Sequence, residues 1–143
     1  MKNLIVDASV ACKWYLPEED RDLAKGLLIG GISLLAPELL FAEVGNVLWK
    51  WLRRGTVDPG EMNHIHWHLT RSLHRIVPLS DLFVPALRMA AAINHPIYDC
   101  FYLALAEREN APLVTADERL ISRLTGTSWE SLVIPLARWE PTL

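Results

Sequence analysis

The stretch Asn3-Leu4-Ile5-Val6-Asp7 decides the fold class of this chain. It is a short apolar run that ends in an acid, which is typical of a strand buried on both faces of a parallel sheet. Further short strands are predicted at residues 32–36, 74–79, 112–115 and 132–136. Helices are predicted between the strands, at residues 18–29, 37–54, 58–73, 80–93, 97–109 and 117–124. Strands that alternate with helices predict an α/β protein with three layers, in which helices cover both faces of a central parallel sheet.

Length and composition indicate one domain, spanning residues 1–143, because 51% hydrophobic residues supply a core without disulfide or metal support. Cys12 and Cys100 do not form a C-x-x-C pair, and the chain does not open with a charged segment followed by an apolar one. No apolar stretch reaches the roughly 20 residues that a membrane span needs. We therefore expect a cytoplasmic protein with no membrane contact.

The net charge of −3 has the wrong sign for a protein that binds nucleic acid over its whole surface, so any such contact is predicted to be local. Lys13 and Arg119 are candidates for a local RNA contact. The alternative for both residues is an ordinary solvated face, which is where most charged side chains lie.

Four acidic residues are placed where the predicted fold would bring them together. Asp7 closes the first strand and Asp117 follows the strand at 112–115, so both lie at the carboxyl edge of the sheet, where open parallel sheets bind ligands. Glu43 lies in the helix at 37–54, and Asp99 is in the first turn of the helix at 97–109. Taken singly, each acid has a structural alternative as a turn residue, a helix cap or an exposed charge.

Taken together, the four acids predict a metal site. Two unit charges about 4 Å apart repel by roughly 4 kcal/mol at an effective dielectric constant near 20, so converging carboxylates need a cation or raised pKa values. Hard oxygen ligands without a cysteine or histidine cage suit Mg²⁺ or Mn²⁺ better than Zn²⁺.

The segments around these acids occur in an order that resembles a known family. They are Leu4-Ile5-Val6-Asp7-Ala8-Ser9, Glu43-Val44-Gly45-Asn46, Tyr98-Asp99 with the Phe101-Tyr102-Leu103-Ala104 run, and Leu113-Val114-Thr115-Ala116-Asp117-Glu118-Arg119-Leu120. This set resembles the PIN-domain family, and within it the VapC-type toxin ribonucleases. The resemblance extends from residue 4 to about residue 136, and it implies the PIN-like form of the three-layer fold.

The resemblance implies a metal-dependent endoribonuclease that is the toxin of a type II toxin–antitoxin pair, silenced by an antitoxin protein and present as a homodimer. Its RNA products would carry 5′-phosphate and 3′-hydroxyl ends. The acids Asp7, Glu43, Asp99 and Asp117 would be catalytic and would hold one or two Mg²⁺ or Mn²⁺ ions. The residues that would support them are Ser9, Asn46 and Thr115.

Other functions stay open at this point. A PIN-like housekeeping nuclease for RNA processing would carry the same acids, and so would an RNA- or protein-binding module with little nuclease activity. A phosphatase that opens on a strand-end Asp is disfavoured, because it would want a second acid at the position of Ser9. A receiver-type phosphorylation domain is disfavoured because it wants paired acids near the first strand.

Two further features have alternative interpretations. His64 and His68 have the spacing of a zinc pair, although a polar helix face or an interface is the simpler interpretation. Six tryptophans are many for this length. We expect Trp51 and Trp67 in the core, and Trp14, Trp49 and Trp139 at a dimer surface or an antitoxin groove.

Overall fold

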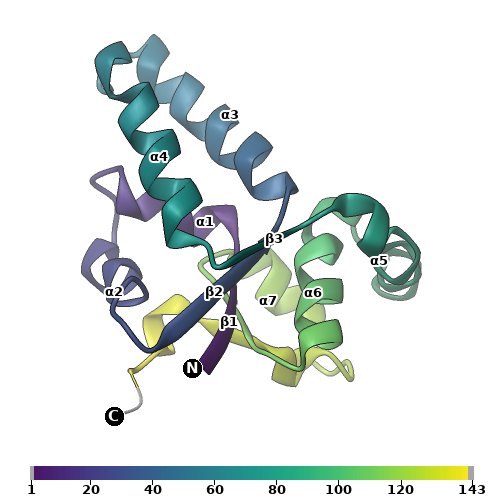
Figure 1. Ribbon diagram of the computed structural model, residues 1–143. Coiled ribbons are helices and arrows are strands. Elements are labelled where there is room, and N and C mark those ends of the chain that lie inside the picture. Colours follow the sequence, from purple (N-terminus) through teal and green to yellow (C-terminus); the bar gives the residue numbers. More distant parts are fainter. Residues whose placement is uncertain (1, 142–143) are drawn as a thin grey trace.

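The computed structural model describes residues 2–141 and has a five-stranded parallel sheet at its centre (Figure 1). Met1 and residues 142–143 of the predicted domain lie outside the described residues. The strands are β1 (Lys2–Val6), β2 (Ile32–Pro37), β3 (Arg75–Val77), β4 (Leu113–Thr115) and β5 (Val133–Pro135). Their order in the sheet is β3-β2-β1-β4-β5, and every neighbouring pair is parallel. All the carboxyl ends therefore meet at one edge.

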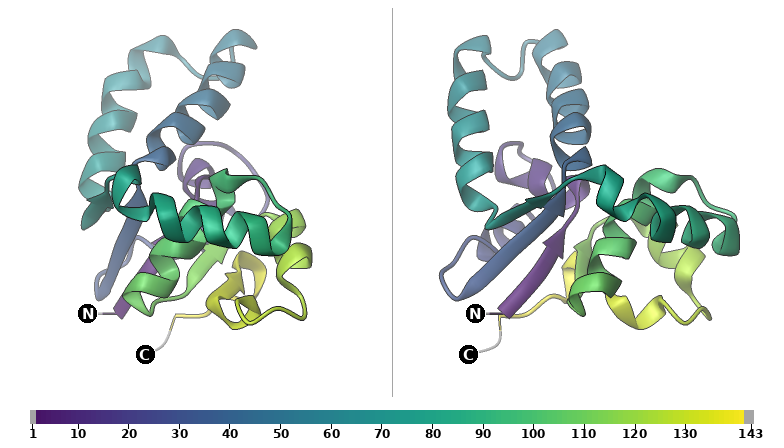
Figure 2. Two further views of the ribbon diagram at one scale, coloured as in Figure 1. Left: turned by 90° about the vertical axis from the view of Figure 1, so that its right-hand side faces the viewer. Right: turned by 45° about the vertical axis from the view of Figure 1, so that its right-hand side comes forward.

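Helices cover both faces of this sheet. They are α1 (Ala8–Ala11), α2 (Arg21–Gly26), α3 (Leu39–Arg53), α4 (Met62–Ser72), α5 (Leu79–Ile93), α6 (Ile97–Glu109) and α7 (Glu118–Leu124). Short 3₁₀ turns are η1 (Cys12–Trp14), η2 (Pro59–Glu61), η3 (Glu130–Leu132) and η4 (Leu136–Arg138). The helices between β1 and β3 lie on one side of the sheet, and the later helices lie on the other (Figure 2). The predicted three-layer α/β/α architecture is confirmed. No helix within residues 2–141 is long and apolar enough to cross a membrane.

Helix α6 is the central helix of its layer. Its residues from Cys100 to Ala106 are all buried, because one side lies against β1 and β2 and the other against α5. Leu103 and Leu105 are completely buried, and burial of a leucine side chain contributes about 1.5–3 kcal/mol. The nearly uninterrupted apolar sequence of this helix follows from that double contact.

Helices α3 and α4 form a hairpin that projects from the body of the protein (Figures 1 and 2). Trp49 and Trp67 lie on this hairpin and are 50% and 54% exposed. Trp49 was expected at the surface, but the prediction of a core position for Trp67 was wrong, because the outer face of α4 has no element packed over it. Trp51 is half-buried against the core.

The expected surface positions of Trp14 and Trp139 were also wrong, since both side chains are buried. Trp14 donates a hydrogen bond from Nε1 to the carbonyl of Ala24 at 2.8 Å, which ties η1 to α2. Trp139 lies against Gly26 of the same helix. Both rings therefore fix α2, whose six residues are too few to hold a helix without such support.

Most element boundaries agree with the predictions. The helix expected at 18–29 begins only at Arg21, after Asp20 adopts a left-handed conformation with φ of 61°. The helix expected at 58–73 divides into η2 and α4, because Pro59 begins a 3₁₀ turn capped by Asp58. The one-turn helix α1 was not predicted.

Candidate active site

Asp7 leaves the carboxyl end of β1 and caps α1. The register of β1 and β4 pairs Val6 with Val114, so the next residues, Asp7 and Thr115, leave the sheet side by side. Thr115 donates a hydrogen bond from its hydroxyl to Asp7 Oδ2. Ser9 donates from Oγ to Asp7 Oδ1 at 2.7 Å, and the backbone N–H of Val10 donates to the same oxygen at 3.3 Å. Both oxygens of Asp7 are thus held in place.

This carboxyl group is buried, with only 5% of the residue exposed. Burial raises the pKa of Asp7 from 3.8 to about 7, although the hydrogen bonds from Thr115, Ser9 and Val10 oppose the shift. The negative charge of Asp99 adds to the increase. Near neutral pH, Asp7 therefore lies at the midpoint of its titration, and a nearby cation would favour its ionised form.

Ser9 and Thr115 also connect β1 to the chain segment that carries Asp117. Ser9 Oγ accepts a hydrogen bond from the N–H of Ala116 at 3.0 Å, and Thr115 Oγ1 accepts one from the N–H of Asp117 at 3.0 Å. Ser9 and Thr115 therefore each contact both Asp7 and the backbone that leads to Asp117, and their supporting roles stay a prediction.

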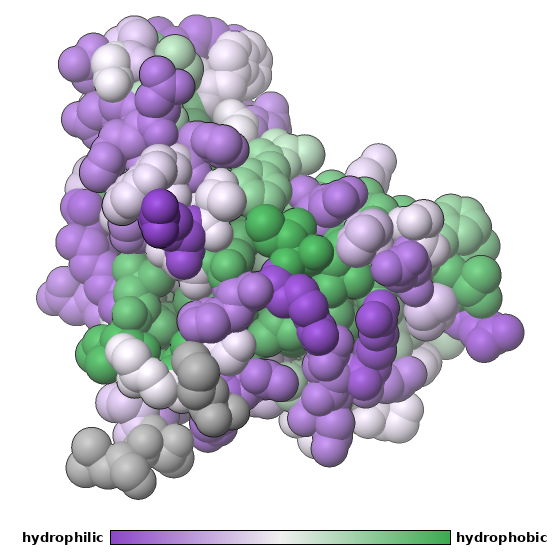
Figure 3. All heavy atoms as spheres, in the orientation of Figure 1, coloured by the Kyte–Doolittle hydropathy of each residue, from purple (hydrophilic) through white to green (hydrophobic). Residues whose placement is uncertain are grey.

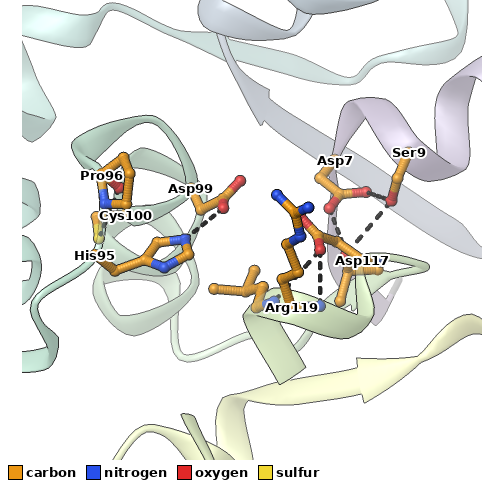
Figure 4. Close-up of polar contacts among 10 residues, drawn as sticks. Asp7, Ser9, His95, Pro96, Asp99, Cys100, Asp117 and Arg119 are labelled. Carbon is orange, nitrogen blue, oxygen red and sulfur yellow. Dashed lines mark hydrogen bonds and ion pairs between the residues drawn. The ribbon is translucent and has the colours of Figure 1, made fainter. Parts of the chain in front are cut away.

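Asp117 and Asp99 flank this centre, and within residues 2–141 each side chain is hydrogen-bonded through one of its two oxygens (Figure 4). Asp117 Oδ1 accepts from the N–H groups of Arg119 and Leu120 at 3.0 and 3.3 Å, which makes Asp117 the N-cap of α7. Asp99 Oδ2 is 2.6 Å from His95 Nε2. The structural alternative of a helix cap is therefore confirmed for Asp117, which also lines the cavity described below.

Glu43 reaches the same region from α3. Tyr102 of α6 donates a hydrogen bond from its hydroxyl to Glu43 Oε1 at 2.6 Å. Burial raises the pKa of Glu43 while the Tyr102 bond lowers it, and the charges of Asp99 and Asp117 raise it further. Glu43, Asp99 and Asp117 also line one cavity, so their negative charges repel one another.

One cavity of about 680 Å³ at the carboxyl edge of the sheet brings the predicted residues together. Its lining includes seven predicted site residues: Asp7, Ser9, Lys13, Glu43, Asn46, Asp99 and Asp117. Two others lie around it. Thr115 is fully buried and contacts Asp7, and Arg119 lines an adjoining cavity that shares Asp99 and Asp117 with the first.

The donor chemistry of this cavity fits a hard divalent cation. Five acidic residues line it, the four predicted ones and Glu18, and carboxylate oxygens are the ligands that Mg²⁺ and Mn²⁺ prefer. Cys12 lines the same cavity, and burial raises the pKa of its thiol to about 12. Within residues 2–141, no three Asp, Glu, His or Cys side chains stand close enough to form a complete ligand cage.

The histidine pair of α4 lies elsewhere and has other contacts. His68 Nδ1 is 2.7 Å from the hydroxyl of Tyr15, and His64 stacks on Trp67. These contacts agree with the simpler interpretation of a polar helix face.

Two residues of the site were missed as individual candidates. His95 contacts Asp99, and Tyr102 contacts Glu43. His95 precedes Asp99 by four residues but lies before the N-cap of α6, Pro96, so helical spacing gave no signal for this contact. Tyr102 was noted only as part of an apolar run, because nothing local indicates that its hydroxyl meets a residue 59 positions away.

The sequence is similar to a known protein family and to a known ribonuclease. The sequence matches the PIN domain family over residues 4–126, a range that contains all four acids. Ribonuclease VapC3 of Pyrobaculum aerophilum is 30% identical over 123 residues, which cover 84% of this chain and 93% of that protein.

Solved structures agree with the sequence matches. A crystal structure of a protein from Pyrobaculum aerophilum has a TM-score of 0.62 at 25% identity, covering 95% of this chain and 90% of the other. A toxin–antitoxin complex from Klebsiella pneumoniae has a TM-score of 0.64 at 11% identity, covering 96% and 99%. The second likeness concerns the fold alone.

Proposed function

Since this chain belongs to the PIN domain family, we propose that it is a metal-dependent endoribonuclease of the VapC type. The observation that carries the proposal is the convergence of Asp7, Glu43, Asp99 and Asp117, from four separate segments, on one cavity at the carboxyl edge of the sheet. The similarity to Ribonuclease VapC3 supports RNA as the substrate.

The four acids would hold one or two Mg²⁺ or Mn²⁺ ions. When bound, such an ion lowers the pKa of a coordinated water and offsets charge on a phosphate group. Other residues of the chain hold the acids in position and add positive charge at the cavity. Ser9 and Thr115 orient Asp7, Tyr102 orients Glu43, and Lys13 places a positive charge at the cavity. Hydrolysis at this site would leave 5′-phosphate and 3′-hydroxyl ends.

We further propose that the protein acts in the cytoplasm as the toxin of a type II pair, with an antitoxin protein as its partner. The family resemblance and the similarity to a VapC protein support this role. A small neighbouring reading frame for an antitoxin would favour it over a housekeeping role in RNA processing.

A homodimer is part of the same proposal. Phe83, Val84 and Leu87 are about half exposed on one face of α5, at 51%, 54% and 49%. Hydrophobic surface is visible over this helix in Figure 3. A row of large apolar side chains on one helix is typical of a face that another protein covers. The molecular mass in solution tests this part directly.

The nuclease is tested by incubating purified protein with total RNA in Mn²⁺ or Mg²⁺, with EDTA and an Asp7→Asn variant as controls. We expect discrete cuts that need the metal and disappear in the variant, and mapping of the new ends gives their chemistry. Absence of cuts from folded protein free of antitoxin would favour the alternative of a binding module. An Asp7→Asn variant with full activity would contradict the assignment.

A further inference from the structure

A second cavity, of about 820 Å³, adjoins the cavity that holds the four acids. Asp99 and Asp117 line both, so the two spaces meet at these carboxylates. The remaining lining residues are His95, Pro96, Glu118, Arg119, Ser122 and Arg123. The volume is within the range of pockets that hold small ligands, and a nucleotide is of that size.

The second cavity differs from the first in charge. Arg119 and Arg123 are exposed and four residues apart on α7, so their side chains share one face of the helix. Three acids, Asp99, Asp117 and Glu118, line this cavity as well, so two guanidinium groups lie beside three carboxylates, whereas the first cavity has five acids and one lysine. One cavity is therefore acidic, and the space beside it carries two guanidinium groups.

The guanidinium groups of these two arginines are also available to bind a ligand. Within residues 2–141, neither guanidinium takes part in an ion pair, whereas Arg75 pairs with Glu109. Other arginines lie over aromatic rings, as Arg71 does at 4.8 Å from the Trp67 ring centroid. Arg119 and Arg123 can thus bind an anion without first breaking an ion pair.

The position of Arg119 relates this charge to the candidate active site. In Figure 4 its side chain extends between Asp99 on one side and Asp7 and Asp117 on the other. An anion bound by Arg119 would lie at the boundary between the two cavities. Guanidinium groups bind phosphate oxygens through paired, charge-assisted hydrogen bonds.

We propose that the second cavity is a subsite for the phosphodiester next to the one that is cut, held by Arg119 and Arg123. The inference rests on the proposed nuclease function and specifies how the substrate lies. A single strand of RNA passes through both cavities, with one phosphate at the acids and the adjacent phosphate at the arginines. Ser122 supplies a hydroxyl donor to the same phosphate.

The first test measures binding rather than cleavage. A fluorescein-labelled single-stranded RNA is titrated with protein in EDTA at several salt concentrations, comparing wild type with an Arg119→Gln, Arg123→Gln double variant. We expect roughly 10-fold weaker binding by the double variant and a salt dependence reduced by about one phosphate contact. Arg54→Gln is the control for removal of a charge, because Arg54 is exposed at the tip of the α3–α4 hairpin.

The second test locates the phosphate. An RNA that contains a mapped cut site is prepared with one uncharged methylphosphonate linkage on either side of the cut. In wild type, the neutral linkage on one side raises KM roughly 10-fold with little change in kcat. In the double variant that linkage causes no further loss, since the arginines that would sense its charge are absent.

The outcomes separate this subsite from the nuclease itself. A wild-type enzyme that cuts RNA, with a double variant that behaves like Arg54→Gln in both tests, would refute the subsite and leave the nuclease standing. Failure of wild type to cut, with the binding difference intact, would refute the nuclease and keep the cavity as an RNA site. Equal KM increases in wild type and double variant, or no binding of RNA by wild type, would also overturn the proposal.

Discussion

Replacement of Asp7 by asparagine is expected to stabilise the metal-free protein at alkaline pH. Burial raises the pKa of Asp7 from 3.8 to about 7. A tenfold change in proton affinity corresponds to about 1.4 kcal/mol, so ionising Asp7 in the folded protein costs about 4 kcal/mol more than ionising it in the unfolded chain.

The direction of the effect follows from which state binds the proton. Below about pH 4 both states hold Asp7 neutral, and the residue imposes no cost. As the pH rises toward 7, the unfolded chain releases the proton while the folded protein keeps it, so the free energy of unfolding falls by about 1.4 kcal/mol per pH unit. Above pH 7 the full loss is reached. The asparagine side chain of the variant does not titrate, so the variant avoids this loss.

The measurement is urea denaturation in EDTA at pH 4, 6 and 8 for wild type, Asp7→Asn and Asp22→Asn. The excess stability of Asp7→Asn over wild type should grow by about 4 kcal/mol between pH 4 and pH 8. Asp22 is exposed on α2, so Asp22→Asn makes the same chemical change in water and should follow wild type. Acids that do not interact with Asp7 contribute equally to all three proteins and cancel.

Parallel curves for wild type and Asp7→Asn across this pH range would refute the reasoning, because they would mean that Asp7 ionises in the folded protein as easily as in water. Mn²⁺ should reverse the order of stability at pH 8. A ligand that binds the folded state stabilises it in proportion to its affinity, so wild type should gain stability from the ion and Asp7→Asn should not.

Three further predictions concern the neighbours of the site and the core. His95→Ala should weaken Mn²⁺ binding about 10-fold in calorimetry, because Asp99 loses its partner, and His95→Gln should recover part of the loss; equal binding by all three proteins would contradict this role. Tyr15→Phe removes the hydroxyl that contacts His68 and should cost about 1 kcal/mol in urea denaturation, with RNA cleavage unchanged. Leu103→Ala should cost about 2–5 kcal/mol by the same assay because Leu103 is completely buried, whereas an unchanged midpoint would place Leu103 outside the core.

Sequence periodicity predicted the architecture because the sheet is buried on both faces. The apolar residues of β1 and β4 are buried in the folded protein. Helix α6 is apolar on all sides because it lies between the sheet and α5. The strand-end positions of Asp7 and Asp117 then located the edge of the sheet at which ligands bind. Each of these inferences needs only local pattern and general rules of α/β topology.

The features that sequence could not predict depend on how distant elements are oriented. The exposure of Trp67 and the burial of Trp14 and Trp139 follow from where α4, η1 and η4 lie, which apolar character alone does not encode. The bond from Tyr102 to Glu43 requires α6 and α3 to meet at one point across the cavity. Such contacts depend on tertiary structure, and the spacing of apolar residues in α3 and α6 does not predict them.

The distribution of charge explains how a protein with a net negative charge could bind RNA, the proposed substrate, which is also negatively charged. At physiological ionic strength, exposed charges more than about 8 Å apart are largely screened, so the net charge of −3 matters less to RNA than the groups beside its path. The acids are gathered in one cavity, where a divalent cation would offset them, and Arg119 and Arg123 line the space next to it. In the proposed arrangement, a strand that reaches both cavities would meet a bound cation in one and two arginines in the other, whereas RNA elsewhere would meet a weakly repulsive surface. Local charge of this kind favours recognition at the cut site over general affinity for nucleic acid.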